Sequence, residues 1–231
     1  MRLRVRASLA FPLAGVDWWR KVAVGGATGL LLELVFVGLA YLVSEEAAFG
    51  VAPLVVILNL PAVGYILQVY RATLQWEDGA LPEWERWPAL VQSGLVGFGI
   101  LLAYGLLPLL LLLTGLGLLV QGGVLLFLGM VVMVLGVLAG ILTLFFLPMA
   151  LARYLAKRRV ELAFHPGAVW DGINAVLVEY VSAYLLSVAS YVLAALVAVL
   201  PYVGPLVWPF LWFYLVLAQA HLFGEICARA S

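Results

Sequence analysis

Six long runs of apolar residues constrain the fold of this chain more than any other feature. Each run is close to the roughly 20 residues that a helix needs to cross the hydrocarbon core of a bilayer. Hydrophobic residues make up 66% of the chain and charged residues only 10%, too few to cover a water-facing surface. We therefore predict an all-α integral membrane protein with six transmembrane helices. They cover residues 22–43, 51–70, 94–113, 124–147, 180–200 and 206–223.

A turn is expected between the third and fourth runs, although only a short glycine-rich stretch separates them. Gln121, Gly122 and Gly123 mark this stretch. An unbroken helix over residues 94–147 would be roughly 80 Å long, far beyond the thickness of a bilayer. A turn here divides the six helices into three hairpins.

The basic residues orient the predicted helices. All twelve Lys and Arg side chains fall in residues 1–21, 71–93 and 148–179 or in the C-terminal tail, which lie on one side of a six-helix arrangement. The opposite side carries only Glu45 and Glu46. Cytoplasmic loops of membrane proteins hold the excess of Lys and Arg. We therefore predict a multi-pass protein of the cell membrane with both termini in the cytoplasm.

A segment with proline and tryptophan precedes three alternate helices. Its prolines, Pro12, Pro82 and Pro166, lie 70 and 84 residues apart. Proline suits the first turn of a helix, and tryptophan favours the headgroup level. Each segment is therefore predicted to be an amphipathic helix on the cytoplasmic face that leads into a hairpin. The expected interfacial anchors are Trp18, Trp19, Trp84, Trp87 and Trp170.

This pattern divides a single transmembrane domain, residues 1–231, into pseudo-repeats of approximately 8–71, 80–154 and 164–225. The alternative interpretation is that any loop returning to a membrane attracts Trp and Pro. Sequence shared among the three segments beyond these residues is slight.

Several blocks of residues resemble one family along nearly the whole chain. They are Phe11-Pro12 with Asp17-Trp18, Gly64-Tyr65 with Arg71, Leu81-Pro82-Glu83-Trp84, Arg153-Tyr154, Glu179-Tyr180 and His221-Leu222-Phe223-Gly224. Together the blocks resemble the uncharacterised prokaryotic family of polytopic membrane proteins catalogued as domain of unknown function four-thousand-and-thirteen (DUF4013). The resemblance implies an all-helical membrane protein of bacteria or archaea, and it implies no activity and no catalytic residue.

Residues that could carry out catalysis are sparse. The two histidines, His165 and His221, and the one cysteine, Cys227, are not at metal-ligand spacing, and no glycine-rich phosphate loop is present. We therefore predict no enzyme activity, no metal and no cofactor. Twelve basic residues balance twelve acidic ones, which excludes a nucleic-acid binder. The expected partners are membrane lipids and a homo-oligomer or membrane complex.

Glu33 is the one carboxylate near the centre of a predicted helix. It is twelfth in the run 22–43, and Asn59 and Pro61 lie at similar depth in the next run. A carboxylate near the midplane next to a helix interrupted by proline is typical of transporter sites. The alternative, which we favour, is a protonated Glu33 that holds helices together by a hydrogen bond to Asn59 or to a hydroxyl.

A basic cluster follows the fourth run and consists of Arg153, Lys157, Arg158 and Arg159. Such clusters attract anionic lipid headgroups at about 1 kcal/mol per charge. Ordinary control of topology explains the same pattern and is the favoured interpretation.

Two classes of function remain. The first is a scaffold, accessory subunit or lipid-organising protein. The alternative is a small transporter or channel that uses Glu33 and the second run interrupted by Pro61. The first class is favoured by small residues at four-residue spacing, which let helices approach closely. These pairs are Gly25/Gly29, Gly136/Gly140 and Ala194/Ala198.

Overall fold

The computed structural model describes residues 5–44, 50–76, 79–201 and 203–230, and within these ranges it contains helices and no strand. Six helices are long and apolar enough to cross a membrane, which confirms the predicted class. Glu45 and Glu46 lie outside the described residues. The elements are α1 (Val5–Ala10), η1 (Phe11–Leu13), α2 (Trp18–Leu42), α4 (Ala52–Leu74), α5 (Trp87–Gln121), α6 (Gly123–Lys157), η2 (Val160–Phe164), α7 (Pro166–Ala175), α8 (Leu177–Ala198) and α9 (Val203–Cys227).

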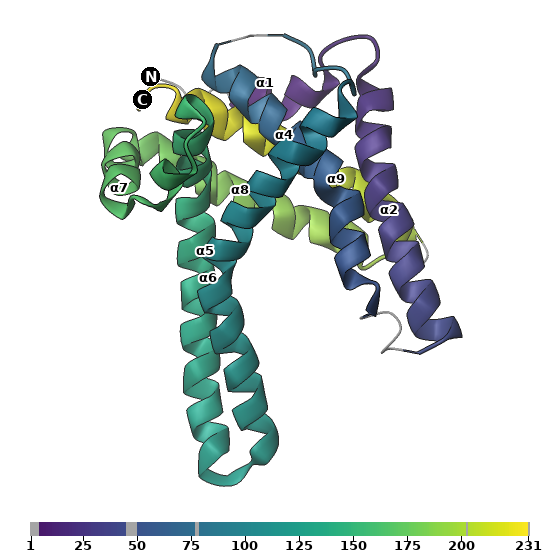
Figure 1. The fold of residues 1–231 in the computed structure, drawn as a ribbon, viewed down its shortest axis with the longest axis vertical. Helices are drawn as coiled ribbons and strands as arrows, with labels where there is room; N and C mark the ends of the chain where they lie inside the picture. Colours follow the sequence, from purple (N-terminus) through teal and green to yellow (C-terminus); the bar gives the residue numbers. More distant parts are fainter. Residues whose placement is uncertain (1–4, 45–49, 77–78, 202, 231) are drawn as a thin grey trace.

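The third and fourth helices are longer than the sequence predicts. α5 and α6 each have 35 residues, or about 52 Å at 1.5 Å per residue. The turn between them is confirmed at Gly122 and Gly123. Their φ angles of 72° and 58° lie in the left-handed region that glycine adopts readily. The two helices form a long hairpin whose turn projects away from the rest of the molecule (Figure 1).

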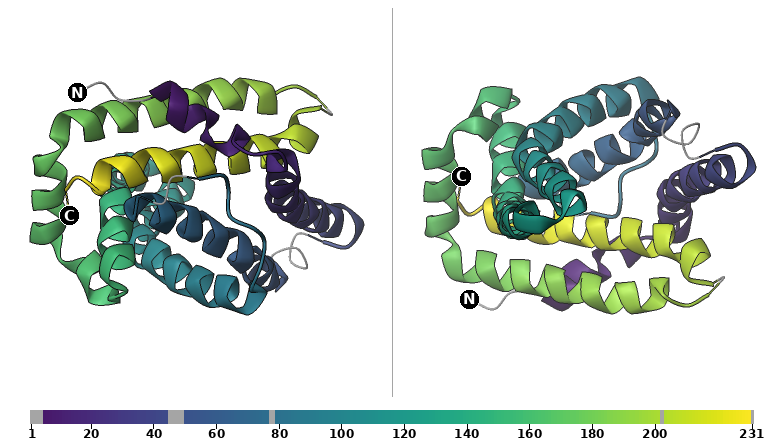
Figure 2. Two further views of the ribbon diagram at one scale, coloured as in Figure 1. Left: turned by 90° about the horizontal axis from the view of Figure 1, so that it is seen from above. Right: turned by 90° about the horizontal axis from the view of Figure 1, so that it is seen from below.

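α9 lies at the centre of the other helices. It packs against α1, α2, α4 and α8, whereas α2 and α4 contact each other much less. α8 and α9 run side by side and cross the α5–α6 hairpin, which is seen nearly end-on in Figure 2. Large buried side chains such as Tyr65, Tyr180 and Phe213 fill the region where these elements meet. The core therefore lies at one end of the hairpin and leaves the other end without neighbouring helices.

Close helix contacts depend on glycines. A Cβ atom on Gly25 or Gly29 would collide with or press on side chains of α9, and one on Gly136 would press on Leu112. These contacts agree with the predicted small-residue packing. A tighter contact was not predicted from the sequence: at Gly64 and Gly94, a Cβ atom would overlap the backbone of the facing helix, so α4 and α5 touch there through their backbones.

Pro148 interrupts the hydrogen-bond pattern of α6, and two tyrosines from other helices bond to the same turn. Proline has no N–H to donate to the carbonyl one turn earlier. The Tyr180 hydroxyl accepts from the N–H of Met149 (3.3 Å) and donates to the carbonyl of Phe145 (2.7 Å). The Tyr70 hydroxyl donates to the carbonyl of Pro148 (2.7 Å). Hydroxyls from α8 and α4 therefore meet the backbone groups of this turn.

Two of the three predicted interfacial helices are not formed. In the first segment, residues 11–19, the chain forms only the one-turn 3-10 helix η1 before α2 begins at Trp18, and residues 81–86 form no helix. The third segment is helical and forms α7. The physical reason is clearest at Leu81 and Pro82. The residue before a proline avoids helical angles, and the carbonyls of both residues accept hydrogen bonds from Lys21 Nζ (2.6 Å) and Tyr65 Oη (2.7 Å).

Candidate functional site

Glu33 lies half-buried on the side of α2 that faces α9. It follows Gly25 and Gly29 by successive steps of four residues, and both glycines pack on α9. Among the described residues it forms no hydrogen bond and no ion pair. Its carboxylate therefore lies on a packed helix face without a partner in that part of the chain.

The structure does not join the three intramembrane candidates into one site. The amide of Asn59 donates to the carbonyl of Val55 (3.3 Å) in its own helix, and no bond to Glu33 is formed in the described residues. Pro61 lies inside α4, which continues as one helix from Ala52 to Leu74. The broken helix that would favour a transporter site is therefore not seen.

The basic cluster after the fourth helix is divided among different surroundings. Arg153 lies against α7, where its guanidinium approaches Gly172. Lys157 is exposed, and Arg159 forms an exposed ion pair with Glu161 (3.5 Å). Arg158 ends α6 and lines a polar cavity. The four residues therefore lie in different surroundings.

This polar cavity was not predicted. Its volume is about 570 Å³, and its walls come from the end of α4, residues 83–86, the start of α5 and the end of α6. The charged side chains in its walls are Arg71, Arg86, Arg158, Glu83 and Glu85. All of these elements lie at the end of the molecule where the predicted topology places the basic residues.

The electrostatic balance in the polar cavity favours an anion. The Glu83 carboxylate forms an ion pair with the ammonium of Lys21 (2.6 Å between Oε1 and Nζ), and Lys21 is buried. None of the three arginines forms an ion pair with a described residue. The Nε atom of Arg71 is buried and has no hydrogen-bond partner in the described part of the chain. Among the described residues, the carboxylate of Glu85 is therefore the one cavity carboxylate without an ion-pair partner. Three guanidinium groups line the same cavity.

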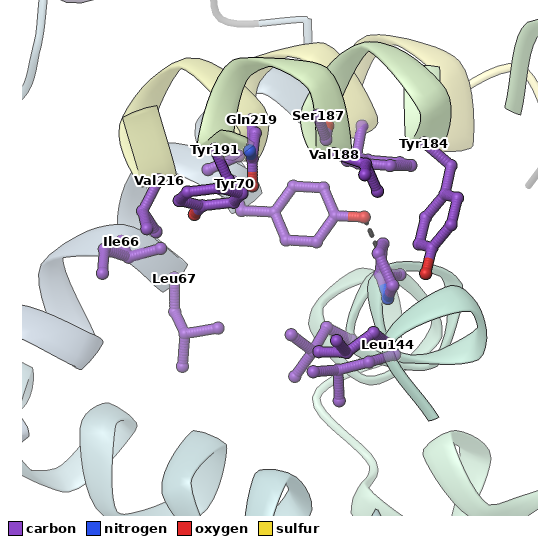
Figure 3. Close-up of a pocket in the computed structure, with 15 residues that line it drawn as sticks. Ile66, Leu67, Tyr70, Leu144, Tyr184, Ser187, Val188, Tyr191, Val216 and Gln219 are labelled. Atoms are coloured by element: carbon purple, nitrogen blue, oxygen red, sulfur yellow. Dashed lines mark hydrogen bonds between the residues drawn. The ribbon is translucent and has the colours of Figure 1, made fainter. Parts of the chain in front are cut away.

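A second cavity, which is apolar, lies between α4, α6, α8 and α9. Its volume is about 280 Å³, near the lower end of the range for small-molecule sites, which is about 300–1,000 Å³. Figure 3 shows Tyr70 reaching across from α4 toward α6, with Tyr184, Tyr191 and Gln219 around the same space. Leu67 belongs to the walls of both cavities. The two cavities therefore adjoin at one side chain.

Three of the four hydroxyl groups in the walls of the apolar cavity donate to backbone carbonyls. Tyr70 and Tyr184 donate to carbonyls of α6, at 2.7 and 3.4 Å, and Ser187 donates to Ala183 (2.8 Å). The fourth hydroxyl, that of Tyr191, lies next to the amide of Gln219, whose buried Nε2 makes no hydrogen bond of good geometry among the described residues. No His, Cys, Asp or Glu of the described ranges lines the cavity. The cavity is therefore suited to an alkyl chain with at most one hydrogen-bond acceptor.

The predicted interfacial tryptophans differ in their surroundings. Trp19, Trp87 and Trp170 are exposed, and Trp18 is half-buried. Trp84 is half-buried as well, and it stacks on Tyr65 (4.1 Å between ring centroids) and donates to the carbonyl of Lys21 (3.0 Å). Trp84 therefore packs the connector at residues 81–86 onto the helices rather than standing free at a surface.

The residues available for other chemistry are few. Within the described ranges, no three His, Cys, Asp or Glu side chains are grouped so that they could hold a metal ion. His221 stacks on Phe11 (4.0 Å), and Cys227 is buried next to the Tyr70 hydroxyl (3.4 Å). Both residues belong to α9 and take part in its packing against neighbouring elements.

The chain was compared with protein families, curated proteins and solved structures. The model of one family, described as "Protein of unknown function (DUF4013)", matches residues 48–203. No curated protein and no solved structure matches. The matched residues include α4 to α8 and therefore all the walls of the polar cavity and most of the walls of the apolar one.

Proposed function

Because the chain belongs to the DUF4013 family, as its motifs predict, and because that family has no assigned activity, we propose a function from the geometry of the chain itself. The protein is a non-enzymatic multi-pass membrane protein that organises lipids. It receives one acyl chain in the cavity between α4, α6, α8 and α9.

The apolar cavity is the observation that carries this proposal. Six long apolar helices support a location in a bilayer, where acyl chains are the surrounding solvent. The cavity walls need almost no polar partner, since most of their hydroxyls are bonded to backbone carbonyls. The Gln219 amide can donate to an ester carbonyl at the end of an acyl chain. A cavity of this kind selects an alkyl chain over a polar solute.

The proposed orientation and assembly follow the charge pattern. Both termini lie in the cytoplasm of a prokaryotic cell, and the whole chain is one transmembrane domain of three helix pairs. α7 lies at the interface, with Trp170 exposed and Val169 and Ile173 buried. The lipid-organising role operates in a homo-oligomer or a membrane complex, without cofactor, metal or nucleic acid.

The test compares two variants of one helix. Val188 lines the cavity, whereas Val192, one turn later in α8, does not and is 60% exposed. The full chain is extracted from phosphatidylcholine vesicles in mild detergent, and retained phospholipid is measured by native mass spectrometry. We expect wild type and Val192→Phe to retain lipid and Val188→Phe, which fills the cavity, to lose it. Equal retention in both variants, or none in wild type, would contradict the proposal.

A small transporter is the second candidate, and one observation favours it. Glu33 is half-buried on a helix face and has no partner among the described residues. A carboxylate near the centre of a membrane-spanning helix is typical of transport sites. Proton-linked flux in liposomes, lost in Glu33→Gln, would support this candidate over the lipid-organising one.

A further inference from the structure

We propose that Arg71, Arg86 and Arg158 together bind a phosphate group in the polar cavity. If the phosphate belongs to a lipid, this site rests on the proposed function, because it binds the headgroup of the lipid whose acyl chain lies in the apolar cavity. For a free phosphate, the site stands independently.

The three arginines converge from separate elements. Arg71 lies in the last turn of α4, Arg86 precedes α5, and Arg158 follows α6. Guanidinium groups present paired N–H donors that match phosphate oxygens. Three of them around one cavity of about 570 Å³ leave room for a phosphate and its substituent.

The charge arrangement leaves these arginines available. Lys21 pairs with Glu83, and no described carboxylate lies within ion-pair distance of any of the three. The buried Nε–H of Arg71 has no acceptor in the described residues. A buried donor without an acceptor is unfavourable, so an anion that accepts from it is bound with a gain in free energy.

The backbone supplies an independent observation. Arg86 has φ 54° and Arg158 has φ 53°, both in the left-handed region where glycine is favoured. Among the described residues, a third non-glycine residue, Trp76, also has a positive φ but does not line this cavity, whereas Arg86 and Arg158 line it at the two ends of the α5–α6 hairpin. Backbone strain at two side chains around one cavity is expected where their positions serve a ligand.

Two sources of phosphate fit this chemistry, a phospholipid headgroup and a free phosphate ion. The adjoining apolar cavity, which shares Leu67, favours the lipid. The full chain is therefore reconstituted in nanodiscs of phosphatidylcholine alone and in nanodiscs that also contain phosphatidylglycerol. Inorganic phosphate is titrated into the first set, and retained lipid is measured by native mass spectrometry in both.

Neighbouring arginines provide the matched variants. Arg158→Gln removes a cavity charge, and Arg159→Gln removes the same charge from the exposed pair with Glu161. We expect Arg158→Gln and Arg71→Gln to weaken binding about tenfold or more, and Arg159→Gln to leave it unchanged. Arg86→Gly and Arg158→Gly should also lose binding while their melting temperature rises, because glycine relieves the strain. Weaker binding together with a higher melting temperature distinguishes loss of the site from misfolding.

Each outcome decides a point. Selective retention of phosphatidylglycerol supports a lipid headgroup, and saturable binding of inorganic phosphate supports the free ion. Equal binding in Arg158→Gln and Arg159→Gln, or no binding of either probe, overturns the site. Retention of phosphatidylcholine that depends on Val188 but not on Arg158 would leave the proposed function standing and reject only the phosphate site.

Discussion

The hydroxyl of Tyr180 bonds to two backbone groups of α6 near Pro148, where the helix has lost a donor. Tyr180 is fully buried, so no water replaces these bonds. The sequence shows Pro148 and Tyr180 but not their proximity, since 31 or more residues separate the partners. At this scale, one oxygen atom contributes two of the hydrogen bonds between α8 and α6.

Removal of that oxygen should destabilise the protein. We expect Tyr180→Phe to lower the free energy of unfolding by about 1–2 kcal/mol, because a buried N–H and a buried carbonyl lose a partner. Tyr184→Phe is the control, since its hydroxyl makes one long bond of 3.4 Å at an exposed position. Unfolding in mixed micelles with increasing dodecyl sulfate measures both variants. A cost for Tyr184→Phe as large as that for Tyr180→Phe would rule out this explanation.

Glu33 provides a second test at the scale of one residue. It has no hydrogen bond in the described residues, so Glu33→Gln and Glu33→Leu should both leave the free energy of unfolding within about 0.5 kcal/mol of wild type. Micellar unfolding and proton flux in liposomes are measured on the same preparations. Loss of about 1–2 kcal/mol in the Leu variant alone would instead support the interhelical hydrogen bond. Flux lost in the Gln variant would support a proton site.

At the scale of elements, α4 and α5 meet through Gly64 and Gly94, where a Cβ atom would overlap backbone atoms of the facing helix. Glycines were expected to allow close helix packing, but this pair was not singled out. The spacing rule finds small residues four apart on one helix, and it does not identify a single glycine matched to another across an interface.

Substitution of two glycines in α5, Gly94 and Gly99, should change stability in opposite directions, because only Gly94 faces another helix at close range. Gly94→Ala places a methyl group on the backbone of Leu60 and should cost about 1–3 kcal/mol. Gly99→Ala in the same helix meets no atom within 4 Å and should stabilise by about 0.4–1 kcal/mol, because alanine is less flexible when unfolded. Thermal melting of the two variants in one detergent checks the signs. A destabilised Gly99→Ala would show that α5 has a contact on that face.

The connector at residues 81–86 illustrates a different limit. Its Pro and Trp residues predicted an interfacial helix, yet its carbonyls accept hydrogen bonds from Lys21 and Tyr65, and Trp84 stacks on Tyr65. Local pattern describes which residues suit an interface. The local pattern carries no information about side chains of distant helices, which here bond to the backbone carbonyls that a helix would have used.

At the scale of the whole molecule, α8 and α9 cross the α5–α6 hairpin rather than continue alongside it (Figure 1). We still expect six crossings, because all Lys and Arg fall on one predicted side. Reporter fusions after Ser44, Gln121 and Leu200 should therefore report the outside, and those after Gly79, Arg159 and Ala230 the cytoplasm. A cytoplasmic signal after Leu200 alone would mean that α8 and α9 enter and leave the membrane on the same face.

The sequence by itself determined the class of protein, the six apolar helices, the glycine turn at Gly122–Gly123 and the family. These properties follow from local composition, because run length and hydropathy decide whether a helix is stable in hydrocarbon. Of the candidate site residues, only Arg158 lies in the polar cavity. Arg71 was recognised as part of a family motif and Arg86 as a charge on one side, and neither was predicted to bind a ligand.

Only the tertiary structure decided which helices touch, where the two cavities lie, and that three arginines from separate elements converge. The tertiary structure also decided that α8 and α9 cross the α5–α6 hairpin. The physical reason is that apolar side chains are interchangeable to a bilayer, so hydropathy carries no information about which helix pairs with which. That choice depends on backbone contact at glycines and on hydroxyls that reach a distant helix turn, which are interactions between residues far apart in the chain.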